Sequence, residues 1–164
     1  MRLFVIPSAR KKAFSDFVLR DLKTKTGAKF KKTAEGDLEL EGEGGSEYFA
    51  ELVLIAIAFG FEYKKALKLL NDEFFLEVLD LNAAMWGKKA RIAQMKARII
   101  GTGGKAKNTL KFLSDCWISI FEDKVALLGR YEDLKNAKEG ILQLLEGKAH
   151  GSVYAFLEKK NARK

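Results

Sequence analysis

A glycine-rich segment in the second half of the chain has the residue types that suit contact with a phosphate group. It reads RIIGTGGK over residues 98–105. Glycines let a backbone approach a phosphate closely, because no side chain blocks the contact. If a helix begins directly after the loop, its free N–H groups and the positive end of its dipole add to the attraction. Gly101 to Gly104 is therefore the candidate anion-binding loop, and Lys105 and Lys107 would add positive charge.

Two phosphate-binding patterns of nucleotide-dependent enzymes compete for this segment. The phosphate loop of nucleotide hydrolases needs a Gly five positions before the Gly-Lys pair and a Ser or Thr after it. Those places hold Ile99 and Ala106. The permissive dinucleotide pattern is met by Gly101, Gly103 and Ala106, with the acidic Glu122 about twenty residues on. That pattern needs a strand before the loop and a parallel strand after it, whereas the flanking sequence predicts helices and an antiparallel hairpin.

The sequence on both sides of the loop predicts the elements that would hold it. We expect a strand at 74–81, helices at 88–100 and 106–113, strands at 116–121 and 124–128 with a tight turn between them, and a helix at 131–145. The loop would therefore join two helices that lead into a hairpin. A plain helix–helix turn without a ligand is the alternative interpretation.

The first half of the chain predicts the same order of elements. It has a short strand at 3–6, helical periodicity over 8–25, strands at 29–33 and 38–41, and an apolar helix at 46–59. Pairs such as Leu22 with Leu110 and Gly42 with Gly129 recur at nearly constant spacing. We infer an internal duplication of a strand–helix–helix–strand–strand–helix unit. Each copy would be an α+β module, a three-stranded sheet covered on one face by three helices.

Composition narrows the classes of function. The net charge of +8 and the pI near 9.5 favour a polyanionic partner. One cysteine, Cys116, and one histidine, His150, do not make a zinc site, which needs three or four ligands. No pair of acidic residues stands out as an acid/base couple, so we expect no catalytic residues, no cofactor and no metal. The single cysteine and the absence of a long apolar stretch predict a cytoplasmic protein that does not cross a membrane.

Two segments of the chain resemble a known family. The run RIIGTGGKAK over residues 98–107 resembles the core of a type I KH domain. The run GKAHGSVYAFLE over 147–158 resembles the tail of archaeal two-KH-domain ribosome-assembly proteins. These are similar to the eukaryotic partner-of-Nob (Dim-two) pre-rRNA processing factor, and the Krr family shares parts of the second module. The resemblance covers nearly the whole chain and is strongest from Phe74 onward.

The resemblance implies a fold and a function. The fold would be α+β with two type I KH modules: residues 1–61 as a first module, 62–73 as a linking helix, and 74–164 as a second module with the glycine loop. Such proteins bind single-stranded RNA near the 3′ end of small-subunit ribosomal RNA and help its maturation beside a separate endonuclease. Some archaeal members resemble partners of the alpha subunit of the translation initiation factor that delivers initiator tRNA.

The loop chemistry and the resemblance together predict an RNA-binding site in the second module. The loop backbone would contact phosphates, a basic run leading into the loop would add charge, and apolar side chains would form the floor of a groove for unstacked bases. The predicted site residues are Arg91, Lys96, Arg98, Ile100, Gly101, Thr102, Gly103, Gly104, Lys105, Lys107, Leu110 and Ile118. Of these, Ile100, Leu110 and Ile118 would form the groove floor. His150 is expected to be a structural hydrogen-bonding group at the start of the last helix, or an RNA contact.

The first module departs from the KH pattern. Its own glycine loop should stand at residues 13–16, which read AFSD, and Asp16 would repel phosphate. We expect this module to be a degenerate copy used for packing or for protein contact. The alternative to an RNA-binding function is therefore a protein-interaction adaptor, in which the KH fold grips a translation initiation factor or an assembly nuclease.

Overall fold

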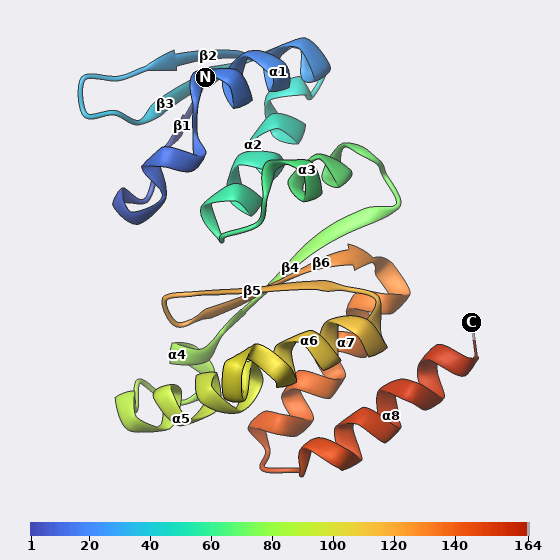
Figure 1. Ribbon diagram of the computed structural model, residues 1–164. Coiled ribbons are helices and arrows are strands. Elements are labelled where there is room, and N and C mark those ends of the chain that lie inside the picture. Colours follow the sequence, from blue (N-terminus) through green and yellow to red (C-terminus); the bar gives the residue numbers. More distant parts are fainter. Residues whose placement is uncertain (164) are drawn as a thin grey trace. The chain divides into compact units, whose positions relative to one another are not determined.

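The computed structural model describes residues 1–163, and the chain divides into two compact units, Met1–Asp72 and Glu73–Lys164. Each unit contains one three-stranded antiparallel sheet with helices packed on it (Figure 1). The predicted α+β class with two three-stranded sheets is confirmed.

The first unit runs through eight elements. They are β1 (Arg2–Phe4), the 3-10 helix η1 (Ser8–Ala13), α1 (Asp16–Thr26), β2 (Lys29–Lys32), β3 (Leu38–Glu41), α2 (Ser46–Ala58), α3 (Tyr63–Ala66) and the 3-10 helix η2 (Leu67–Leu70). The strands lie in the order β1-β3-β2, so the last strand is central. The segment expected as a linking helix forms α3 and η2, and both belong to this unit.

The single helix expected over residues 8–25 is wrong, because the structure breaks it in two. η1 ends at Ala13, and α1 begins at Asp16 with Ser15 as its N-cap. The Ser15 hydroxyl accepts a hydrogen bond from the backbone N–H of Val18, which is the usual way a serine starts a new helix. Phe14 is buried against Phe4, whereas Phe17, three residues further on, is exposed.

The second unit repeats the topology of the first and adds further helices. It contains β4 (Phe74–Asp80), α4 (Leu81–Ala84), α5 (Lys89–Ile100), the 3-10 turn η3 (Thr102–Gly104), α6 (Lys105–Ser114), β5 (Trp117–Phe121), β6 (Lys124–Arg130), α7 (Tyr131–Leu145) and α8 (His150–Ala162). Its strand order, β4-β6-β5, again makes the last strand central. The same order in both units is what a duplication predicts.

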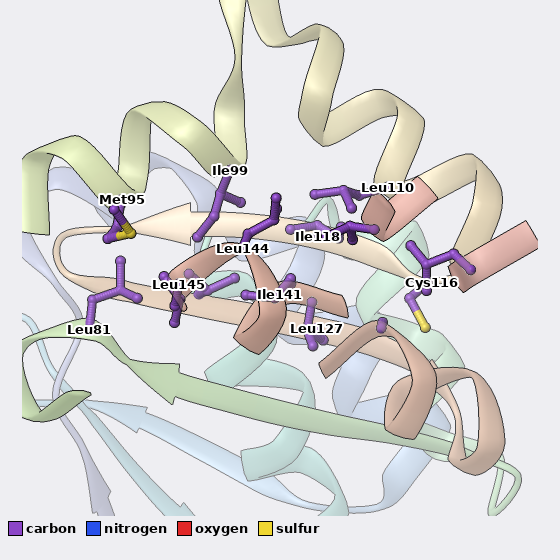
Figure 2. Packing of buried hydrophobic residues seen from close by; sticks show 14 of the residues in the cluster. Leu81, Met95, Ile99, Leu110, Cys116, Ile118, Leu127, Ile141, Leu144 and Leu145 are labelled. Atoms are coloured by element: carbon purple, nitrogen blue, oxygen red, sulfur yellow. The ribbon is translucent and has the colours of Figure 1, made fainter. Parts of the chain in front are cut away.

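The core of the second unit fixes α5 and α6 against the sheet. Val125 and Leu127 of β6 point to the helix side, and Ile118 pairs directly with Leu127 in the antiparallel register. Ile99 and Leu110 carry this core into the two helices that flank the glycine loop (Figure 2). Full burial of a side chain such as Ile99 stabilises the fold by roughly 1.5–3 kcal/mol. The two ends of the loop are therefore held by packed side chains.

Candidate nucleic-acid interface

The glycine loop joins α5 and α6, as the sequence predicted. Gly101 has φ +73°, which residues with a side chain rarely adopt. A Cβ atom on Gly101 would lie 2.6 Å from the Cβ of Ala106 and 2.7 Å from its backbone nitrogen. Gly101 is therefore required by the fold itself, since it lets the first turn of α6 pack directly onto the end of α5.

Gly103 and Gly104 have a different surrounding. Both also have positive φ, but no atom lies within 4 Å of the position that a Cβ would take on either residue. Gly104 is the N-cap of α6, and no side chain caps that end of the helix. The first backbone N–H groups of a helix lack partners within the helix, and the helix dipole makes this end positive. The loop thus places uncrowded glycine backbone directly before the N-terminus of α6, where the Gly104 N–H donates within the loop to the carbonyl of Gly101.

Two lysines flank this open backbone. Lys105 and Lys107 lie in the first turn of α6, and neither forms an ion pair with any carboxylate in residues 1–163. Lys105 is exposed and Lys107 is half-buried. Their ammonium groups therefore remain available for an anion at the loop.

Arg98 is placed differently from these lysines. One guanidinium nitrogen donates to the carbonyl of Leu144, and another donates to the carbonyl of Lys148 at 2.6 Å. The Nε2 atom of His150 lies 2.8 Å from the carbonyl oxygen of Arg98, so it donates to that oxygen. Arg98 and His150 together tie the end of α5 to the connection between α7 and α8. The structure thus gives His150 the structural hydrogen bond expected of it, and an RNA contact by Arg98 stays a prediction.

Two other predicted basic residues, Lys96 and Arg91, have partners elsewhere in the second unit. Lys96 forms an ion pair with Asp123, with 3.7 Å between Nζ and Oδ1, and so links α5 to the β5–β6 turn. Arg91 lies in the first turn of α5, where its side chain bonds Gln94. At about 1.5 Å of helix per residue, Arg91 is roughly 15 Å from Gly101. The structure does not bring Arg91 to the loop.

The apolar groove predicted beside the loop is only partly open. Ile100 is 36% exposed and borders the loop. Leu110 and Ile118 are members of the buried core, so they support the surface from beneath. A base that lies beside the loop would contact Ile100 and the exposed parts of α6.

A cavity at the other end of α6 was not anticipated from the sequence. It has a volume of about 550 Å³, and its lining comes only from the second unit. The lining residues are Asn108, Lys111, Phe112, Asp115, Cys116 and Trp117. Phe112 is 78% exposed. Helical periodicity could have predicted this exposed ring. Phe112 is two positions from the buried Leu110 and therefore points to the opposite side of the helix.

The first unit has no glycine loop at the corresponding place. The break between η1 and α1 occupies it, and there the Asp16 carboxylate pairs with Lys32 across 2.9 Å. The Lys32 ammonium group holds the pKa of Asp16 below its ordinary value. A carboxylate thus lies where the second unit has the open backbone of Gly104. That the first unit is a degenerate KH module stays a prediction.

Residues 1–163 contain neither a cluster of metal-ligating side chains nor a membrane-spanning helix. In that part of the chain, no three His, Cys, Asp or Glu side chains lie close enough to hold a metal ion. None of its helices is both long enough and apolar enough to cross a membrane.

Comparison with known proteins identifies the family. Residues 75–162 match the second KH domain of PNO1, a eukaryotic type KH-domain (KH-domain type I). This chain belongs to the Dim2/Pno1 family of KH-domain proteins. The predicted resemblance to archaeal Dim-two and eukaryotic partner-of-Nob proteins is thereby confirmed, as is the type I KH fold of the second unit.

Relatives in the Dim2/Pno1 family come from archaea and eukaryotes. A KH domain-containing protein of Methanocaldococcus jannaschii is 30% identical over 151 residues, which cover 89% of this chain and 66% of that protein. The pre-rRNA-processing protein pno1 of Schizosaccharomyces pombe is 28% identical over 109 residues, covering 66% of this chain and 45% of the relative. The chain thus spans between about half and two thirds of the length of these relatives.

Solved structures of archaeal proteins share the fold. A protein of unknown function from Aeropyrum pernix has a TM-score of 0.89 at 30% identity, covering 99% of this chain and 90% of the other. Dim2p from Pyrococcus horikoshii has a TM-score of 0.79 at 25% identity, covering 96% of this chain and 98% of the other. A further P. horikoshii structure, a complex of initiation factor 2 alpha, Dim2p and rRNA, matches with a TM-score of 0.83 at 23% identity, covering 99% of this chain and 94% of the matched chain.

Proposed function

We propose that this chain binds single-stranded RNA through its second unit, near the 3′ end of small-subunit ribosomal RNA, during ribosome maturation in the cytoplasm. The observation that carries the proposal is the open backbone of Gly103 and Gly104 at the N-terminus of α6, flanked by two unpaired lysines. Phosphate oxygens are the natural ligands of such a site. The chain acts by binding its RNA and does not catalyse a reaction on it.

The charge of the chain supports a site in the second unit. Residues 73–164 contain seventeen Lys and Arg against eleven Asp and Glu, whereas residues 1–72 contain thirteen against eleven. Most of the net positive charge is therefore in the unit that has the glycine loop. Phosphate contacts release counterions, so the affinity for RNA falls steeply as salt rises.

Single-stranded RNA fits this site better than a duplex. A backbone loop at a helix N-terminus holds phosphates, but it reads no sequence by itself. Sequence choice requires bases that are unstacked and can contact Ile100 and the surface of α6. Such bases are available in single strands, loops and ends, and they are hidden in an A-form helix.

The relatives support the same kind of RNA. The S. pombe relative is a pre-rRNA-processing protein, and the P. horikoshii complex contains Dim2p together with rRNA. That complex also contains the alpha subunit of an initiation factor. It favours a second role for this chain as a partner of that subunit, and a processing endonuclease is a further candidate partner. The first unit, where Asp16 and Lys32 close the loop position, is the surface we assign to protein contact.

The proposed site is tested by a pair of double variants in the glycine loop. Gly103→Asp with Gly104→Asp places two carboxylates beside the phosphates, and we expect RNA affinity to fall roughly tenfold or more. Gly103→Asn with Gly104→Asn has nearly the same shape and backbone strain without the charge, so it is the matched control. Asn and Asp accept positive φ better than most residues, and the space at both positions is open.

The measurement is fluorescence anisotropy with labelled RNA from the 3′ end of small-subunit rRNA at several salt concentrations. A scrambled single strand and a duplex are the competitors. Selective binding that the Asp pair loses and the Asn pair largely keeps supports the proposal. Equal binding by wild type and the Asp pair would move the RNA contact away from the loop.

A further inference from the structure

The exposed aromatic ring of Phe112 is unusual for its place in the second unit. Phe112 is 78% exposed, although it lies in the last turns of a helix whose other side is buried in the core. It borders the cavity of about 550 Å³ that also contains Trp117 and Asn108 in its wall. The fold does not need this ring for packing, so its chemistry is available for a ligand.

The cavity and the glycine loop lie at opposite ends of the same helix, α6. Lys105, Asn108 and Phe112 follow one another at three- and four-residue spacing, so they form a stripe on one face of α6. All three side chains are exposed. From Gly104 to Phe112 the helix rises about 12 Å, at roughly 1.5 Å per residue. At no less than about 3.4 Å per nucleotide, a strand with a phosphate at the loop reaches Phe112 within three or four nucleotides.

The groups in the cavity wall suit a nucleobase better than a phosphate. Lys111 and Asp115 bring one positive and one negative charge, so the cavity has no net attraction for an anion. The amide of Asn108 can both donate and accept hydrogen bonds, and the Asp115 carboxylate accepts them, as the edge of a base requires. Phe112 offers an aromatic face on which a base can stack. Lys111 forms no ion pair within the described residues, so it can meet the phosphate next to that base.

We infer that the cavity beside Phe112 is a nucleobase pocket, which receives one unstacked base of the RNA strand whose phosphates lie at the glycine loop. The inference rests on the proposed function and adds one nucleotide of the RNA at which the base itself is recognised. Phe112 is the stacking platform, Asn108 and Asp115 meet the edge of the base, and Trp117 forms the wall.

An abasic scan of the bound RNA tests this pocket directly. A set of RNA strands is made in which each nucleotide in turn lacks its base, and each strand is bound to the full chain. With wild type, we expect loss of one particular base, three or four nucleotides from the loop-bound phosphate, to weaken binding by roughly 10- to 100-fold. With Phe112→Ala, the intact strand should bind more weakly by a similar factor, and removal of that same base should cost almost nothing more.

Two further variants separate stacking from other causes. Phe112→Tyr keeps an aromatic face and should bind as wild type does, whereas Phe112→Leu keeps an apolar side chain and should resemble Phe112→Ala. Trp86→Ala is the control for loss of an exposed aromatic ring, because Trp86 is 88% exposed and precedes α5 at the end far from the loop. That control should leave the abasic profile unchanged.

The loop variants and Phe112→Ala together distinguish failure of the nucleobase pocket from failure of the proposed RNA-binding function. If the Asp pair in the loop does not weaken RNA binding, the proposed function fails before the pocket is tested. If the loop variants behave as expected but Phe112→Ala keeps the wild-type abasic profile, the pocket is overturned and the loop site stands. If Phe112→Ala instead weakens only the binding of the initiation factor alpha subunit, the cavity contacts protein and the inference is wrong.

Discussion

At the scale of single residues, the glycines of the loop divide into two kinds. Gly101 lies against Ala106, whereas Gly103 and Gly104 border open space. The sequence pattern does not distinguish these glycines, because residue spacing does not show which atoms would lie near an added Cβ. Only the packing of α6 onto the end of α5 separates a glycine needed for folding from glycines open to a ligand.

This division predicts different costs for two single substitutions. Gly101→Ala should lower the free energy of unfolding by roughly 2–4 kcal/mol, because it combines positive φ with overpacking against Ala106. Gly104→Ala has only the backbone strain and should cost about 1–2 kcal/mol. Urea denaturation of the full chain, followed by far-UV circular dichroism, measures both. Equal losses would contradict the close contact at Gly101.

Arg98 allows a second prediction at the residue scale. Its guanidinium donates to carbonyls of Leu144 and Lys148, so Arg98→Ala should lower the free energy of unfolding by about 2 kcal/mol, the size expected for hydrogen bonds to a charged group. If Arg98 also contacts RNA, as the sequence predicts, the folded variant should lose affinity by more than the removal of one charge explains. Denaturation and anisotropy on the same sample separate the two effects. A large loss of affinity with unchanged stability would show that Arg98 contacts RNA.

At the scale of elements, the second unit follows closely from its sequence. The bounds of β4, α5, α6 and α7 lie within a residue or so of the predicted ones, because glycines and a tight turn separate strongly periodic segments. The break inside residues 8–25 was missed, because the apolar period runs across Ser15 and hides its role as an N-cap. The hydrogen bonds of Arg98 and His150 could not be predicted from the sequence for a different reason. They join residues that are far apart in the chain, and no local pattern encodes them.

At the scale of the whole molecule, two units with the same strand order have different surfaces. The second unit keeps the glycine loop and most of the positive charge. The first unit has the Asp16–Lys32 ion pair at the position of the glycine loop. Within the same unit, the Tyr63 hydroxyl donates a hydrogen bond of 2.6 Å to the Asp21 carboxylate, which links α3 to α1. The Tyr63 hydroxyl and the Lys25 ammonium group lower the pKa of Asp21. Burial and the nearby carboxylate raise the pKa of Tyr63, so this hydroxyl stays protonated at neutral pH.

Because the pKa of Asp21 is lowered in the folded protein, the stability of the first unit should decrease as the pH falls into the acidic range. A carboxyl whose pKa is lower in the folded state contributes stability above its unfolded value, near 3.9, and loses it as pH falls through the folded value. Tyr63→Phe removes the main cause of the shift. We therefore expect the variant to melt at a lower temperature at neutral pH, and the difference from wild type to shrink below about pH 3. Thermal melts from pH 7 to pH 2 check this, and a constant difference would contradict the role of Asp21.

The pairing of β4 with β6 joins the beginning of the second unit to a strand near its end. Phe74 pairs with Arg130 across these two strands. In the sequence, the two helices that flank the glycine loop, α5 and α6, come between β4 and β6. While the chain is being synthesised, β4 leaves the ribosome long before its partner exists, and long-range pairing of this kind forms late in folding. The glycine loop gains its fixed shape only when β6 has been made and inserted at the centre of the sheet. The proposed RNA site therefore forms only once the second unit is nearly complete.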